Sequence, residues 1–206
     1  MNEPAHADGA GSIGRVLEAT ISRFTCVCHA LDGAPPLGTL VLVFEGGPAV
    51  YGVVADIRTQ SIDPGRPLTP RGGPEDDRET VLAQNPQIPA LLQTAFEAIV
   101  VGHRRDGGVR RYLPDSPPRI YARVRACTAA ETAEFFHGFE FLPLLLAAGP
   151  LADQVIAACL RRAAAAMPAH PRAFLVQAGR ALAHELAEEP ERLAAVFGQI
   201  RSVAAG

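Results

Sequence analysis

The strongest concentration of like charge in the chain lies between residues 104 and 125. Seven of the nineteen arginines fall there, against Asp106 and Asp115, so the segment carries +5 in a chain whose formal net charge is −3. Guanidinium groups interleaved with tyrosine can hold phosphates and stack on bases. The candidate residues for contact with a protein partner or a nucleic acid are Arg104, Arg105, Arg110, Arg111, Arg119, Tyr121, Arg123 and Arg125.

Three interpretations of this basic segment are open. Its arginines form a solvated face that meets the acidic loop at 75–77 or the glutamate-rich stretch at 185–191, or they dock an acidic protein, or they bind nucleic acid. In the last case the logarithm of the affinity falls steeply with the logarithm of the salt concentration.

Catalytic and metal-binding patterns are weak. The chain has no lysine, which excludes a Walker A loop, a Schiff-base enzyme and a kinase-type nucleotide site. It contains neither G-x-S-x-G nor H-E-x-x-H. Cys26 and Cys28 share a strand face beside His29, but a structural zinc site needs four ligands and no second pair matches. We therefore predict no catalytic residue, no metal and no cofactor.

The amino-terminal residues show no basic stretch followed by an apolar run, and no apolar run reaches about 18 residues. We expect a cytoplasmic protein with no membrane segment. In a reducing compartment the four cysteines are expected to be small buried hydrophobes and not disulfides.

These candidate residues must be positioned by a β-rich first half. Runs of β-branched and small apolar residues predict strands at 13–21, 24–28, 39–44, 49–57, 95–104, 109–113 and 119–126. In the last strand, alternation places Arg119, Tyr121, Arg123 and Arg125 on one face. Short strands with tight turns predict a small antiparallel barrel.

Residues 61–79 interrupt this pattern with four prolines, three glycines and an acidic cluster. A structureless connection of this length is either functional or disordered. A short helix is predicted near 89–92.

After Cys127 the apolar period becomes helical. Thr128 and Glu131 have capping-box spacing, which predicts a helix at 129–137. Apolar stripes from Pro150 onward predict three alanine-rich amphipathic helices that fold back on the barrel or pack across a subunit interface, and we expect an oligomer. The predicted organisation is a disordered tail at 1–11, a barrel at 12–127 and a helical domain at 128–206.

Several short motifs in order point to a family. They are IGRVLEAT at 13–20, the strand at Phe24-Thr25, PPLGTLV at 35–41, YGVV at 51–54, and the strand at 119–127 followed by TAAE at 128–131. Together they resemble the HAS barrel, the small β-barrel shared by HerA-type DNA-translocating ATPases and the α and β subunits of rotary ATP synthases. The resemblance covers roughly residues 12 to 127.

In HerA-like proteins this barrel precedes an ATPase domain and helps to bind a nuclease, and in ATP synthases it ties the subunits together. Here a helical segment stands where the ATPase core would follow, so the resemblance implies assembly or docking without nucleotide hydrolysis.

We therefore expect an α+β protein, a small antiparallel HAS-like barrel followed by helices, that acts as a non-catalytic assembly or adaptor protein. Its barrel would mediate oligomerisation or docking to a partner such as a HerA-type ring ATPase or nuclease. The alternative is a nucleic-acid-binding protein that uses the face at 104–125. A third possibility is an enzyme with a site under the 61–79 loop.

Overall fold

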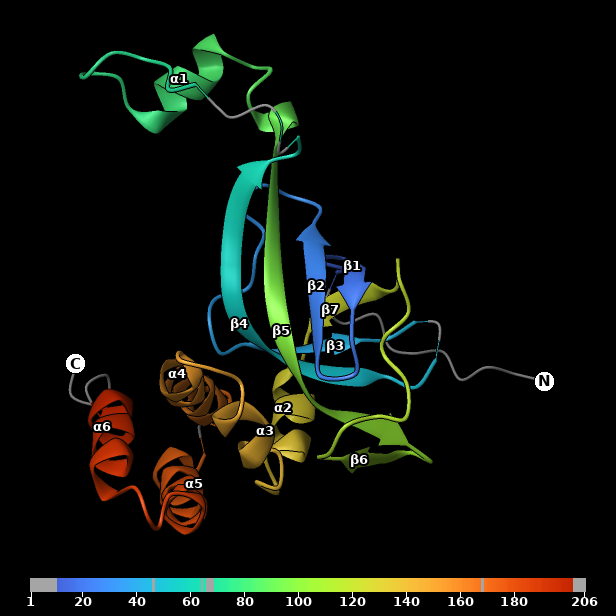
Figure 1. Cartoon of the computed structure of the whole chain (residues 1–206), viewed down its shortest axis with the longest axis vertical. Coiled ribbons are helices and arrows are strands. Elements are labelled where there is room, and N and C mark those ends of the chain that lie inside the picture. Colours follow the sequence, from blue (N-terminus) through green and yellow to red (C-terminus); the bar gives the residue numbers. More distant parts are fainter. Residues whose placement is uncertain (1–10, 46, 64, 66–68, 168, 202–206) are drawn as a thin grey trace.

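The computed structural model describes residues 11–45, 47–63, 65, 69–167 and 169–201. Figure 1 shows a closed antiparallel β-barrel followed by helices, which confirms the predicted α+β class. The barrel strands run in the order β2-β1-β7-β3-β4-β5, and β5 returns to pair with β2. The strands are β1 (Gly14–Ala19), β2 (Arg23–Cys28), β3 (Leu40–Val43), β4 (Val50–Ser61), β5 (Leu92–Arg105), β6 (Gly108–Arg110) and β7 (Arg123–Ala126). The tail predicted at 1–11 lies outside the described residues, apart from Gly11.

Alternating side chains fill the barrel interior. One face of each strand points inward, as the period of two requires. The buried members of this interior cluster are Val16, Phe24, Cys26, Val41, Val43, Val50, Val54, Phe96, Ala98, Val100, Ala122 and Val124. Burial of Cys26 in this cluster agrees with its predicted role in core packing.

The β4–β5 hairpin extends well beyond the barrel body. Both strands are longer than predicted, since β4 reaches Ser61 and β5 begins at Leu92. The connection between them carries α1 (Arg78–Gln84) and the short 3-10 helix η1 (Pro89–Leu91), at the top of Figure 1. Asp77 caps α1 by accepting a hydrogen bond from the Thr80 amide at 2.8 Å. The loop predicted at 61–79 is therefore only part of a larger excursion, residues 62–91, which we call the hairpin tip.

The last barrel strand is shorter than predicted. It spans Arg123–Ala126, and the prediction of a strand from residue 119 is wrong. Tyr121 adopts a φ of 65°, in the left-handed region that non-glycine residues rarely occupy. This turn breaks the alternation, so Arg119 and Tyr121 do not share a strand face with Arg123 and Arg125.

The helical part comprises α2 (Ala129–Phe135), α3 (Leu142–Leu146), α4 (Ala152–Ala165), α5 (Pro171–Glu185) and α6 (Pro190–Arg201). The predicted capping box at the start of α2 is present, with Thr128 and Glu131 each bonding the other's backbone amide. That helix ends at Phe135, two residues earlier than predicted. No helix in the described part of the chain is long and apolar enough to span a membrane.

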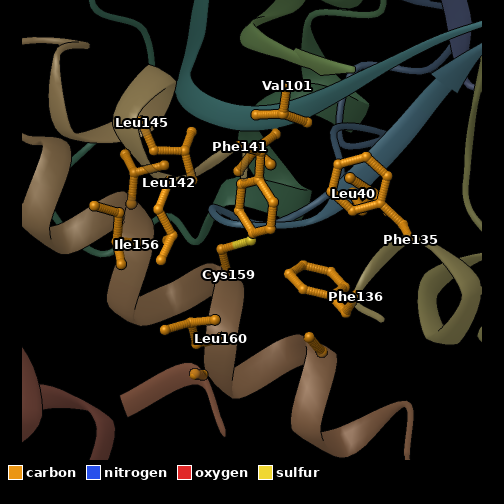
Figure 2. Close-up of a cluster of buried hydrophobic side chains, with 14 of the residues drawn as sticks. Leu40, Val101, Phe135, Phe136, Phe141, Leu142, Leu145, Ile156, Cys159 and Leu160 are labelled. Atoms are coloured by element: carbon orange, nitrogen blue, oxygen red, sulfur yellow. The ribbon is translucent and has the colours of Figure 1, made fainter. Parts of the chain in front are cut away.

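The helices pack on one outer face of the barrel of the same chain, through a second hydrophobic cluster. Barrel residues such as Leu40, Tyr51 and Val101 meet Phe135 and Phe141 there, and Figure 2 shows α4 closing the cluster from below. Further buried members from the helices are Phe136, Leu142, Leu145, Ile156, Cys159 and Leu160.

Close approach of α4 to the barrel depends on Gly38. Its φ is +78°, and a Cβ placed there would lie 2.4 Å from the backbone nitrogen of Cys159. No larger residue fits this contact without displacing the helix. Arg162 adds a hydrogen bond of 2.8 Å to the carbonyl of Leu37, on the same loop.

Candidate functional site

A β-bulge in β5 decides which way the basic segment faces. Val100 pairs with Gly52 and Gly102 pairs with Tyr51, so Val101 is an extra residue that shifts the register. Because side chains alternate along a strand, one extra residue reverses the alternation. His103, paired with Val50, consequently shares the interior side of the barrel, whereas Arg104 lies on the helix side.

Arg104 is held within the fold. Its guanidinium lies 2.6 Å from a carboxylate oxygen of Glu134 in α2 and 2.9 Å from the hydroxyl of Tyr51. These contacts, the one with Glu134 above all, raise the pKa of Arg104. The side chain therefore joins the barrel to α2.

Arg111 stabilises the end of the same helix. It donates to the carbonyls of Phe135 at 2.5 Å and Glu134 at 2.9 Å, and its side chain is only 16% exposed. The last carbonyls of a helix lack intrahelical partners, and a cation there also complements the helix dipole. The guanidinium group of Arg111 therefore contacts groups of the same chain and is not available to a partner.

Arg125 and Arg123 are also paired. Arg125 makes a bidentate ion pair with Glu131, at 2.7 and 2.6 Å, with both side chains largely buried. The hydrogen bonds from Arg125, followed by those from Thr128, lower the pKa of Glu131 to about 2. Arg123 donates to Glu45 at 2.5 Å.

The acidic partners of the basic segment differ from those predicted. In the part of the chain that the structure describes, the segment's carboxylate partners are Glu45, Asp115, Glu131, Glu134 and Glu140. The prediction that the loop at 75–77 or the stretch at 185–191 supplies them is wrong. Residues 75–77 precede α1, at the far end of the β4–β5 hairpin from β6, and the stretch at 185–191 joins α5 to α6 (Figure 1).

The remaining candidate residues lie at the open end of the barrel. Arg105 pairs with Asp115 at 3.1 Å, and both side chains are mostly exposed. Arg110 and Arg119 are exposed and have no side-chain partner among the described residues. Tyr121 is 67% exposed. The eight predicted residues are thus divided between the helix side and this end.

A pocket of about 290 Å³ opens at the same end of the barrel. We call it the mouth pocket. It is lined by Val43, Glu45, Gly47, Pro48, Val50, His103, Arg105 and residues 114–119. The sequence analysis did not single out His103, although a histidine that ends a long apolar strand before two arginines is a signal for a site at a barrel end.

The hairpin tip carries a larger hollow, with a volume of about 800 Å³. Its apolar wall consists of Ile62, Val81, Leu82, Ile88 and Leu91. Neither α1 nor η1 has a buried residue, and Ile62 and Leu91 are 54% and 45% exposed. Among the described residues, the apolar surface of the tip is therefore largely unpaired.

The cysteines are free, and Cys26 and Cys159 are buried. Burial raises the pKa of the Cys159 thiol to about 12 and also raises that of Cys26, so both are protonated thiols at neutral pH. Within the described ranges no three histidine, cysteine or acidic side chains gather as a metal site would require.

The fold and these sites define a small β-barrel with a helical cover on one outer face and a long hairpin arm. No protein-family model matches the sequence, and a comparison with curated proteins finds no match.

Proposed function

We propose that this protein is a non-catalytic assembly or adaptor protein of the cytoplasm that docks a protein partner through the hairpin tip. The observation that carries the proposal is the unburied apolar surface there. Exposed apolar patches with polar rims mark interaction sites, since water contact with them is unfavourable. An arm that projects from a rigid barrel presents such a patch without disturbing the core.

The charge of the tip indicates the chemistry of the partner. Residues 62–91 include five carboxylates against three arginines, and one of these arginines, Arg78, is paired with Asp32 at 2.7 Å. Asp63 and Asp76 line the hollow together with Arg71 and Arg78, so the acidic excess lies on the rest of the tip. Complementary potentials guide association, so the partner should present an apolar segment flanked by basic residues.

The HAS-barrel resemblance of residues 12–127 supplies a specific candidate for the partner. A HerA-type ring ATPase or its nuclease is the class of protein that such a barrel accompanies. A second copy of this chain is the competing occupant, and light scattering of the purified protein distinguishes the two.

The test compares two substitutions of equally exposed leucines. Leu91 in the tip is 45% exposed and Leu17 on β1 is 41% exposed. The full chain and the variants Leu91→Asp and Leu17→Asp are used to capture partners from the native cell, and each captured protein is identified and tested again in purified form.

We expect a partner with an apolar segment flanked by basic residues. It should bind wild type and Leu17→Asp with equal affinity and bind Leu91→Asp more weakly by roughly tenfold or more. Equal binding by all three proteins would refute docking through the tip.

Nucleic-acid binding is the second candidate. The observation in its favour is that Arg105, Arg110 and Arg119 are not buried against the helices, and that Tyr112 and Tyr121 near them are 55% and 67% exposed. Fluorescence anisotropy with single- and double-stranded oligonucleotides at low salt tests it. Binding that weakens with salt and with Arg110→Gln plus Arg119→Gln would support this function; undetectable binding would remove it.

A further inference from the structure

We infer that the mouth pocket binds a small phosphate-bearing ligand, an assignment that stands independently of docking through the tip. The pocket lies where the interior of the barrel opens, because β3, β4 and β5 all contribute inward-facing residues to it. It brings together one imidazole, two guanidinium groups and an apolar wall. Its volume of about 290 Å³ suits a small ligand.

The imidazole of His103 is buried but retains a free nitrogen. The residue is 3% exposed, and its Nδ1 lies 3.2 Å from the carbonyl oxygen of Tyr112. A carbonyl only accepts hydrogen bonds, so Nδ1 carries a proton. No hydrogen bond to Nε2 is found among the described residues. One nitrogen thus fixes the ring and the other remains available to a ligand, since His103 lines the pocket.

The ring of His103 is fixed from a second side as well. Tyr112 packs against it edge to face, with the ring centroids 5.2 Å apart. Arg110, directly opposite His103 on β6, is exposed and is not among the residues that line the pocket. The imidazole is therefore positioned before any ligand arrives, which lowers the entropy cost of binding.

Two guanidinium groups are available to an anion in the pocket. Arg119 has no side-chain partner among the described residues. Within the same part of the chain, the side-chain partner of Arg105 is Asp115, whose side chain is 85% exposed. An ion pair this exposed is weak, so a ligand oxygen can replace Asp115. Guanidinium groups suit phosphate because they offer paired donors in a plane.

Two carboxylates line the pocket, Asp115 and Glu45, and Glu45 is already neutralised. Glu45 accepts from the Arg123 side chain at 2.5 Å and from the Arg123 backbone amide at 3.2 Å, and Arg15 lies 3.9 Å away. It therefore does not repel an anion as a free carboxylate would. Phosphate is the anion that this arrangement favours, because its several oxygens can meet both arginines and Nε2 together.

The opposite wall of the pocket is apolar. Val43, Val50, Pro114, Pro117 and Pro118 form it. Proline fixes the backbone of the 114–118 segment, so this wall is rigid. The space beside it would take a small organic group, which makes a phosphate monoester a better fit than a long polyanion.

The test is calorimetric titration of the full chain with inorganic phosphate and, separately, with glycerol phosphate, at constant ionic strength. The variants are Arg119→Gln and His103→Gln. The matched control is Arg110→Gln, which removes the same charge from a neighbouring position outside the pocket. Circular dichroism checks the folding of each variant, and Arg119 is exposed, so its substitution keeps the test valid if His103→Gln does not fold.

We expect saturable binding that weakens roughly tenfold or more in Arg119→Gln and in His103→Gln and changes less than about twofold in Arg110→Gln. Addition of the ligand should also shift the Nε2 resonance of His103. Tighter binding of glycerol phosphate would identify the ligand as an organic monoester, and tighter binding of inorganic phosphate would identify the free ion. Absence of saturable binding, or an equal loss in Arg110→Gln, would overturn the assignment.

Discussion

The two ends of the β4–β5 hairpin differ in how they use their side chains. At the barrel end, Arg104 of β5 and Arg125 of β7 pair with α2, and Arg123 of β7 pairs with Glu45. At the far end, the hairpin tip has no buried residue in α1 or η1 and leaves its apolar side chains in contact with water. Figure 1 shows these ends on opposite sides of the molecule.

Charged residues usually form binding surfaces and apolar residues usually form the core, but in this protein each type also serves in the other role. Three arginines of the predicted binding surface, Arg104, Arg111 and Arg125, hold α2 to the barrel. Apolar side chains of the hairpin tip, such as Ile62 and Leu91, are exposed instead. A charge count alone does not separate structural arginines from free ones. The two kinds of arginine are distinguished by the partners that each guanidinium group contacts in the folded protein.

The largest change in the free energy of unfolding is expected on substitution of Phe135, the last residue of α2, which packs against the barrel. Its ring is fully buried, with centroids 5.0 Å from Tyr51, 5.4 Å from Phe136 and 5.2 Å from Phe141. Phe135→Ala should lower the free energy of unfolding by about 3–5 kcal/mol, through lost burial and the cavity left behind. Urea denaturation measures this. The control Ile62→Ala, at the exposed tip, should change the free energy of unfolding by less than about 0.5 kcal/mol. Equal losses in the two variants would show that the tip is packed as tightly as the surface between barrel and helices.

A smaller loss of stability is expected on substitution of Glu131. Hydrogen bonds from Arg125 lower its pKa from 4.5 to about 2 in the folded protein. The carboxylate therefore stabilises the fold fully above pH 4.5, and this contribution is lost as the pH falls towards 2. Glu131→Gln should cost about 2 kcal/mol at pH 7, and the difference from wild type should vanish near pH 2.

The matched control for this pair is Asp115→Asn. Asp115 also accepts from an arginine, at 3.1 Å, but its side chain is 85% exposed. An exposed pair contributes about 0–1 kcal/mol, so its loss should be small at every pH. A pH-independent difference between wild type and Glu131→Gln, measured by denaturation at several pH values, would show that the buried pair does not act through its charge.

The smallest effect is expected from removing the tip. Ser61 and Leu92 are paired across β4 and β5, so Asn-Gly in place of residues 62–91 would close the hairpin with a tight turn. The free energy of unfolding should change by less than about 1 kcal/mol, because no buried contact in α1 or η1 is lost and the Arg78–Asp32 pair is exposed. A loss of several kcal/mol in urea denaturation would show that the tip belongs to the core.

Much of the fold could be predicted from local patterns. Runs of β-branched and small apolar residues predicted the strands of the barrel. The tight β5–β6 turn falls at Asp106-Gly107, a pair typical of such turns, and both residues adopt positive φ. The capping box at Thr128 predicted the start of α2. The true length of β4 and β5 could not be predicted, since the outer parts of both strands lack the apolar alternation that burial imposes.

The sequence by itself determined the class of the fold, because the period of its apolar residues changes from two to about 3.6 near Cys127 and this period decides whether a segment forms a strand or a helix. Only the tertiary structure decided what the arginines do. One extra residue, Val101, turns Arg104 towards the helices and His103 towards the barrel mouth, and the left-handed Tyr121 separates Arg119 from Arg123. A bulge and a single positive φ leave no periodic trace in the sequence, yet each reverses the direction of the side chains that follow it.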